Sequence, residues 1–242
     1  QIPKNWSESK ENSTRILFWS YKGFIEEKVK NFNLAYTCFA NSQKNERYNR
    51  CDPISFINYI HEYEESIQYI DHSKVKKDTN FKTKEKLVFL IGFPRSGTTL
   101  LDTILRSHYQ IDVLEEKPLI FSLERIIKTK FKLTLSKINN LKKEDLDYLR
   151  KLYISELHKF KDPNKKANVF VDKNPFLTVS LPLINLLFPK AKIIFTHRNP
   201  FDTVLSCFQQ NFEPNNSMAN LISLKSSSQV YDLTMQMWLL YK

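Results

Sequence analysis

Apolar residues recur three and four positions apart through the first part of the chain, which is the spacing of amphipathic helices. Two such helices, forming a hairpin, are predicted around residues 16–19 and 32–39. The stretch 74–86 is polar and charged, and we interpret it as a linker. The pattern therefore predicts a helical segment over residues 1–80 and a separate domain over residues 87–242.

Beyond the linker, short continuous apolar runs predict buried strands, and periodic apolar stretches between them predict helices. Alternation of strand and helix favours an α/β fold, with a parallel sheet flanked by helices on both faces. Ligands of such folds bind beyond the carboxyl ends of the strands. The strand runs are 87–91, 111–114, 168–171 and 192–196, and helices are expected at 100–105, from Pro118, at 146–160, at 176–188 and from Pro200.

Two of the three glycines bracket a loop directly after the first predicted strand. Gly92 and Gly97 suit a tight turn or a close ligand, and the helix that follows exposes unpaired N–H groups to an anion. The spacing is P-loop-like, but Thr98 stands in place of the P-loop lysine, and Arg95 supplies the cation. Because nucleoside triphosphatases need that lysine, the loop predicts a phosphate-bearing donor that is not a triphosphate.

Composition and charge are compatible with an anionic ligand. The net charge is +11, and the sequence contains no zinc-finger spacing or aromatic RNA-binding signature, so no nucleic acid partner is expected. The three cysteines, Cys38, Cys51 and Cys207, lack metal or redox spacing and favour a reducing, cytoplasmic compartment. No stretch is long enough to span a membrane, and no metal is expected to be required.

The glycine loop resembles the 5′-phosphosulfate loop of sulfotransferases, whose donor is 3′-phosphoadenosine 5′-phosphosulfate (PAPS). Arginine at position 95 is similar to tyrosylprotein sulfotransferases and their bacterial relatives. The resemblance implies that this loop binds the donor and that its arginine also stabilises the transferring group. The donor-binding residues that it implies are Pro94, Arg95, Ser96, Gly97, Thr98 and Thr99.

A second anion site is implied after the run 192–196. Asn199 is a good N-cap and Pro200 suits the first helical position, so a helix is expected to start here. Arg198 then lies at a strand end, and Ser206 follows eight residues later inside the helix. This spacing resembles the family's 3′-phosphate site, where the arginine fork and the serine hydroxyl hold the phosphate.

Two further segments resemble the tyrosylprotein branch. Glu115 and Glu116 fall where that branch carries a glutamate pair, and its second glutamate is the proposed base, which implies Glu116 here. Since the two are adjacent, either could be the base. The segment 171–176 resembles the one whose lysine reaches the sulfuryl group, which implies Lys173, although the branch often has aspartate where Asn174 stands. The predicted reaction is sulfuryl transfer from PAPS to a hydroxyl of a peptide tyrosine, a glycan or a small molecule.

Other functions stay open at this point. A P-loop-type kinase or nucleotidase using ATP and magnesium is one, because the run 168–172 ends in Asp172 and looks like a strand ending in a magnesium-binding aspartate. A non-catalytic, repeat-linked module that binds PAP, the desulfated donor, is another. The resemblance covers residues 87–212, and the family continues past Lys242 with a further strand and donor contacts, so a truncated C-terminus is expected.

Part of the helical segment matches the spacing of a tetratricopeptide repeat. Other positions of that pattern fail, and one copy is present. A terminal, decayed repeat and an ordinary pair of amphipathic helices therefore both remain compatible with the sequence. The matching residues are Trp19, Gly23, Ala35 and Phe39.

Overall fold

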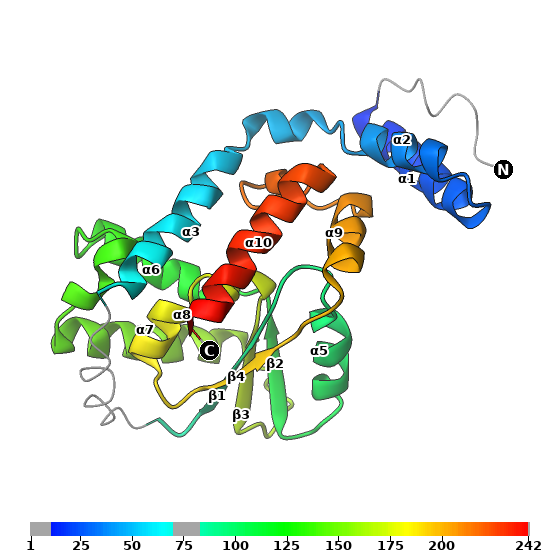
Figure 1. The fold of residues 1–242 in the computed structure, drawn as a ribbon. Coiled ribbons are helices and arrows are strands. Elements are labelled where there is room, and N and C mark those ends of the chain that lie inside the picture. Colours follow the sequence, from blue (N-terminus) through cyan, green and yellow to red (C-terminus); the bar gives the residue numbers. More distant parts are fainter. Residues whose placement is uncertain (1–10, 70–82, 242) are drawn as a thin grey trace. The chain divides into compact units, whose positions relative to one another are not determined.

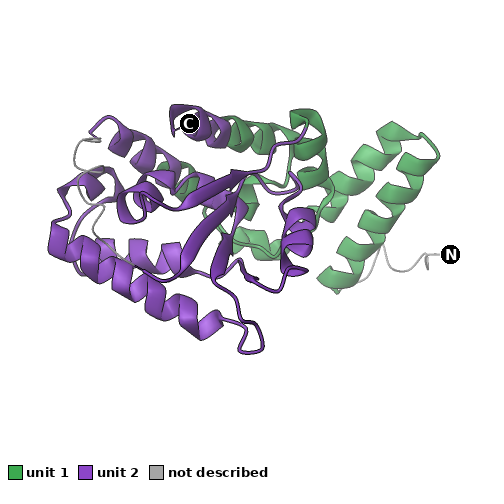
Figure 2. Cartoon of the chain, turned by 90° about the horizontal axis from the view of Figure 1, so that it is seen from below, with its two compact units in different colours: residues 1–58, 199–232 green, residues 59–198, 233–242 purple. Residues whose placement is uncertain are grey.

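The computed structural model describes residues 11–69 and 83–241 (Figure 1). Most of the predicted linker lies outside these ranges. Contacts divide the chain into two units, one of residues 1–58 and 199–232 and the other of residues 59–198 and 233–242 (Figure 2). The predicted boundary between residues 80 and 87 stays a prediction.

The second unit is built on a four-stranded sheet in which every pair of neighbouring strands is parallel, which confirms the predicted α/β class. Its order is β2-β3-β1-β4. Lys173 lies opposite Leu90 of β1 and opposite Glu115 of β2, so the carboxyl ends of three strands meet at one edge. The strands are β1 (Lys86–Ile91), β2 (Ile111–Glu115), β3 (Val169–Lys173) and β4 (Lys192–Phe195).

Helices cover both faces of this sheet (Figure 1). Helix α5 (Thr98–Arg106) packs Leu101 and Leu105 against an apolar cluster from β1, β2 and β3. On the other face, Tyr153 of α7 (Lys143–Phe160) contacts Phe89 of β1, with ring centroids 6.1 Å apart. The remaining elements of this unit are α6 (Leu119–Thr129), η3 (Leu135–Asn140), η4 (Pro175–Thr178) and α8 (Leu181–Leu187).

One predicted helix is wrong in detail. The stretch 176–188 was expected to be a single helix, but it is divided into η4 and α8. Pro182 lacks a backbone N–H, and its ring would clash with a carbonyl one turn earlier, so the helix starts anew just before it. Thr178, the last residue of η4, and Ser180, which lies between η4 and α8, are fully buried at this break. The Thr178 hydroxyl bonds the backbone of Gly92, and the Ser180 hydroxyl bonds Glu124 of α6.

The first unit is helical and contains the predicted hairpin. Its helices α1 and α2 pack closely, because a Cβ at Gly23 would lie 2.7 Å from the ring of Phe39. Phe39 also packs on Phe208 of α9. Whether the hairpin is a tetratricopeptide repeat stays a prediction. The elements are α1 (Asn12–Lys28), α2 (Phe32–Ser42), η2 (Glu46–Arg50), α9 (Pro200–Gln209) and η5 (Met218–Asn220), while α3 (Pro53–Ile67) and α10 (Leu224–Tyr241) contribute to both units.

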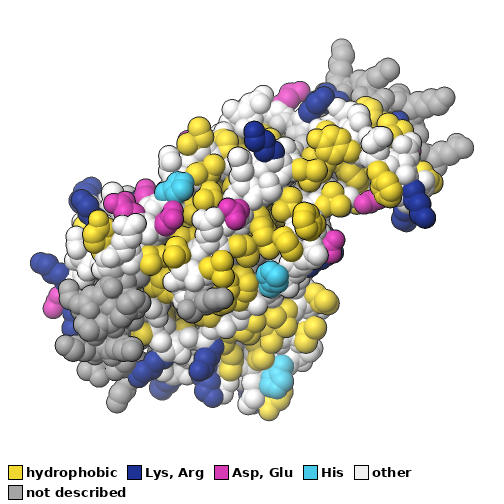
Figure 3. Space-filling view, viewed as in Figure 1, with side chains coloured by type: hydrophobic (Ala, Val, Ile, Leu, Met, Phe, Trp, Pro, Cys, Tyr) yellow, Lys and Arg dark blue, Asp and Glu magenta, His cyan; other side chains and the backbone are white. Residues whose placement is uncertain are grey.

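The surface carries charged and apolar side chains in mixture. On the face drawn in Figure 3, lysine and arginine side chains are dispersed rather than gathered into one basic patch. In the part of the chain that the structure describes, no helix has the length and apolar composition to cross a bilayer.

Candidate active site

The glycine loop joins β1 to α5, as predicted. Gly92 has φ +158°, and a Cβ there would lie 2.7 Å from the Thr196 carbonyl oxygen. Gly97 has φ +104° and is the N-cap of α5. Both positions therefore favour glycine for a physical reason. The first turn of α5 directs its unpaired N–H groups toward the carboxyl edge of the sheet, where an anion is stabilised.

Hydroxyl groups hold this loop in place. Ser96 Oγ lies 2.8 Å from Thr196 Oγ1, just after β4. The N–H of Gly92 donates to Thr178 Oγ1 at 3.0 Å, and that hydroxyl donates back to the Gly92 carbonyl at 2.7 Å. Ser96 and Thr98 are buried, whereas Thr99 is exposed. The Ser96 hydroxyl therefore braces the loop against the residue that follows β4, and a contact of Ser96 with the donor stays a prediction.

Arg95 extends from the exposed side of the loop. Its φ of +67° is in the left-handed region, which is uncommon for a residue with a side chain. Strained backbone of this kind is concentrated at ligand-binding and catalytic sites, at a cost of order 1–3 kcal/mol. This is consistent with a role for Arg95 at an anion.

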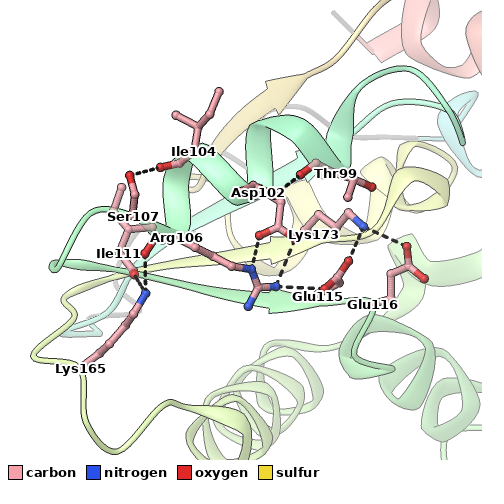
Figure 4. Close-up of polar contacts among 11 residues, drawn as sticks. Thr99, Asp102, Ile104, Arg106, Ser107, Ile111, Glu115, Glu116, Lys165 and Lys173 are labelled. Carbon is pink, nitrogen blue, oxygen red and sulfur yellow. Dashed lines mark hydrogen bonds and ion pairs between the residues drawn. The ribbon is translucent and has the colours of Figure 1, made fainter.

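Three of the predicted residues meet in one ionic cluster at the ends of β2 and β3 (Figure 4). Lys173 is the last residue of β3 and is 1% exposed. Its Nζ donates to Glu115 Oε1 at 3.2 Å and to Glu116 Oε1 at 3.0 Å. A buried ammonium is costly unless it is paired, and two carboxylates supply that pairing here.

Strand alternation explains Glu115 but not Glu116. Successive side chains of a strand point to opposite faces, so Glu115 lies on the same face as Lys173, its neighbour in register. Glu116 would point to the other face if β2 continued. Instead, Glu116 has φ +50°, while its N–H still donates to the Lys173 carbonyl at 2.8 Å. The left-handed turn thus brings its carboxylate back to the same ammonium.

Two further residues join this cluster, and the sequence analysis missed them. Arg106 Nη2 donates to Glu115 Oε2 at 3.3 Å and to Asp102 Oδ2 at 3.1 Å, and its Nε bonds Asp102 Oδ1 as well (Figure 4). The hydrogen bond that Arg106 donates to Asp102 raises the pKa of Arg106 above its usual value. An aspartate and an arginine four apart on the helix that follows the loop were the available signal.

Asp172 does not belong to this cluster. It precedes Lys173 in β3 and faces α7, where the Tyr153 hydroxyl donates to its Oδ2 at 2.9 Å. Its Oδ1 has no hydrogen-bond partner among the described residues. Burial raises the pKa of Asp172 to about 7. The magnesium-binding position that the sequence suggested for a kinase is therefore turned away from the glycine loop's face.

A second buried carboxyl lies in α6. Glu124 Oε1 accepts hydrogen bonds from Tyr59, Tyr63 and Ser180 at 2.9, 2.7 and 2.8 Å. Burial raises the pKa of Glu124 to about 7, although the three hydroxyls oppose this. The contacts join α3, α6 and the turn between η4 and α8, so this carboxyl serves packing.

The two residues of the predicted 3′-phosphate site fall in different units. Arg198 is exposed, three residues past β4, and Ser206 is partly buried in α9. The predicted helix start is confirmed, because Asn199 Oδ1 accepts from the N–H of Phe201 at 2.9 Å. That Arg198 and Ser206 act together stays a prediction.

Comparisons with known proteins agree with the anion-binding site that the geometry indicates. The profile of the Sulfotransferase family matches residues 88–240. An uncharacterized protein of Aquifex aeolicus is 32% identical over 129 residues, covering 52% of this chain and 17% of that protein. Protein-tyrosine sulfotransferase 1 of Homo sapiens is 31% identical over 133 residues, and that of Rattus norvegicus is 31% identical over 134 residues, each covering 52% of this chain and 35% of the relative.

The chain thus spans about a third or less of the length of these relatives. The family match covers more than half of the chain and includes the glycine loop, both glutamates, Lys173 and Arg198. On this evidence the chain belongs to the sulfotransferase family.

Proposed function

We propose that this protein transfers a sulfuryl group from PAPS to a hydroxyl acceptor. The observation that carries the proposal is the convergence at one edge of a parallel sheet. At this edge lie the N-terminus of α5 and the loop residue Arg95, whose backbone is in the left-handed region. The buried Lys173 and the carboxylates that it bonds lie there too. Ligands of such folds bind at this edge. The names of two matching relatives, both protein-tyrosine sulfotransferases, support a tyrosine acceptor.

The residues of the loop fit the 5′ end of the donor. Gly97 caps α5 with a positive φ, and apart from its own chain neighbours no described atom lies within 4 Å of where its Cβ would be, so an anion can approach the backbone. The N–H groups of Thr98 and Thr99, in the first turn, would bind the phosphate, with the exposed Thr99 hydroxyl beside them. Arg198 and Ser206 would bind the 3′-phosphate.

The donor supplies an electrophilic sulfur whose bond to the 5′-phosphate oxygen breaks as the acceptor oxygen bonds to it. Glu116 would accept the proton that the acceptor hydroxyl loses. Lys173 and Arg95 would stabilise the charge that develops on the equatorial oxygens and on the leaving phosphate. A phenol suits a carboxylate base better than an alkanol does, because its ordinary pKa is about 10.

Lys173 would change partners during this cycle. Without donor, its ammonium is bonded to both glutamates. An anionic sulfuryl group competes for the same ammonium, and drawing Lys173 from Glu116 leaves that carboxylate ready for the acceptor proton. Glu116 is 56% exposed at its side chain, which allows an acceptor to reach it.

The kinase alternative loses its main support. It required Asp172 to bind magnesium near the loop, but Asp172 faces α7 on the opposite side of the sheet from Lys173. A non-catalytic module that binds PAP stays open and differs from the proposal in turnover alone.

The test has two measurements. Thermal unfolding with PAP and, separately, with ATP and magnesium shows which nucleotide binds, since a ligand at 100 times its Kd stabilises by about 2.7 kcal/mol. Transfer from radiolabelled PAPS is then measured with a tyrosine peptide and with its phenylalanine counterpart. We expect a shift with PAP and label on the tyrosine peptide. A shift with ATP and magnesium alone would contradict the proposal, and PAP binding without transfer to any hydroxyl acceptor would favour the non-catalytic module.

A further inference from the structure

Behind the proposed base lies a chain of charges that begins inside α5. Asp102 is 2% exposed and holds Arg106 one turn later through two hydrogen bonds. Arg106 in turn donates to Glu115 Oε2, while Lys173 donates to Glu115 Oε1 (Figure 4). Each oxygen of Glu115 therefore has its own cation.

The end of α5 is itself fixed in place. Lys165 Nζ donates to the carbonyl oxygens of Arg106 at 2.9 Å and Ile111 at 3.0 Å. These carbonyls lie at the last residue of α5 and the first residue of β2. The backbone of Arg106 is thus tied to the strand that carries Glu115, in addition to the contact between their side chains.

The two glutamates consequently differ in how many cations hold their carboxylates. Glu115 is held by a cation at each oxygen, whereas Glu116 accepts a hydrogen bond from Lys173 at one oxygen, and its other oxygen has no partner among the described residues. Glu116 is accordingly the member of the pair with a carboxylate oxygen open to an acceptor hydroxyl.

We infer that Arg106 is a positioning residue for the sulfuryl transfer, a role that rests on the proposed function. Arg106 neutralises Glu115 and holds it against Lys173, so that Lys173 keeps one anchor when it releases Glu116. Helix α5 begins at the donor loop and ends at Arg106. One rigid element therefore aligns the donor phosphate with the lysine and with the carboxylate that remains free.

The first test compares Arg106→Gln with Arg125→Gln, which removes the same charge from an exposed position of α6. We expect Arg106→Gln to lower kcat about tenfold while the Kd for PAP stays within about twofold, because Arg106 acts through Glu115 and not on the donor. Arg125→Gln should match the wild type. Arg106→Lys should restore part of the loss, since it keeps the charge but not the fork. A parallel loss of PAP affinity would overturn the inference.

The second test is a double-mutant cycle with Glu115→Gln. If Arg106 acts through Glu115, Arg106→Gln costs little more once Glu115 is neutral. Losses that multiply would reduce Arg106 to a structural role.

A third measurement separates this inference from the proposed function. Urea unfolding of the same four proteins, without donor, reports the coupling of Arg106 to Glu115 independently of turnover. Coupling in unfolding together with a wild type that transfers no sulfuryl group would contradict the proposed function and leave the ionic contact standing. Additive unfolding free energies would overturn the placement of Arg106, whether or not the protein is active.

Discussion

Two neighbouring residues of β3 carry opposite charges and lie in opposite surroundings. Lys173 is at the open edge of the sheet, bonded to Glu115 and Glu116, whose side chains are 48% and 56% exposed. Asp172 faces α7, where one tyrosine hydroxyl meets it within an aromatic layer. Strand alternation puts the two on different faces, so a single step along the chain separates an ionic cluster with exposed carboxylates from a buried carboxyl bonded to one tyrosine.

The difference shows that burial alone does not mark a functional group. Both Lys173 and Asp172 are at most 2% exposed, and both precede the same turn. Lys173 has charged partners that a ligand or acceptor can reach, whereas Asp172 has none among the described residues. We therefore expect chemistry on the α5 face and an effect on stability alone on the α7 face.

The largest effect should come from removing the proposed base. Glu116→Gln keeps the shape of the side chain but cannot take a proton, so kcat should fall by about 10²–10⁴-fold while PAP affinity is kept. Single-turnover transfer from PAPS and calorimetric PAP binding measure the two quantities. Asp172→Asn is the matched control from the other face and should retain kcat within a few-fold. Unchanged turnover in Glu116→Gln would remove Glu116 from the mechanism.

The second-largest expected effect is a dependence of the free energy of unfolding on pH, which the buried carboxyls cause. Burial raises the pKa of both Asp172 and Glu124 to about 7 in the folded protein, above the ordinary values near 4. The folded state then binds more protons than the unfolded state between pH 4 and 7. The stability that these two groups contribute is full below about pH 4 and is lost as pH rises to about 7, by a few kcal/mol.

Urea unfolding at pH 5 and pH 8 measures this dependence. Asp172→Asn mimics the protonated form, so it should reduce the difference between the two pH values and be relatively more stable at pH 8. Glu124→Gln should likewise remove the part of the pH dependence that Glu124 causes. An equal pH dependence in the wild type and in both variants would mean that neither carboxyl titrates in this range, and the contrast between the two faces would then rest on Lys173 alone.

Arg198 follows the outer strand β4 at the same edge of the sheet as Lys173, so it provides a third position to compare. Arg198→Ala should weaken PAP binding by about ten- to a hundredfold, the loss of a charge-assisted contact, with little effect on kcat at saturating donor. AMP lacks the 3′-phosphate and provides the control: its affinity should be similar in variant and wild type. If AMP binding weakened as much as PAP binding, Arg198 would not act on the 3′-phosphate.

Much of the fold follows from local pattern. The four apolar runs were predicted within two residues of the observed strands, because buried parallel strands consist of continuous apolar stretches. Parallel topology then brings strand ends together, which is why Glu116 and Lys173 could be expected to lie close to each other. Pro182 could have predicted the interruption between η4 and α8, but the single helix expected over 176–188 does not take it into account.

The rest of the site depends on backbone and long-range geometry that sequence pattern does not contain. Glu116 reaches Lys173 because its φ is positive, and nothing in a glutamate predicts that. The bond between Ser96 and Thr196 joins residues 100 positions apart, so its existence depends on the order β1-β4 in the sheet. Sequence pattern therefore suggests Ser96 as a donor ligand without indicating that its hydroxyl also bonds Thr196.

That hydroxyl pair gives the smallest expected effect. Thr196→Val keeps the shape but removes the bond to Ser96, and a neutral hydrogen bond contributes about 0.5–1.5 kcal/mol, so PAP affinity should fall about two- to tenfold with kcat unchanged. Ser96→Ala should cost about the same, and the double variant less than the sum of the two. Thr129→Val is the control, since its exposed hydroxyl bonds the Arg125 carbonyl within α6. Full additivity would mean that each hydroxyl acts separately, and the loop would then owe its shape to the two glycines and Thr178 rather than to β4.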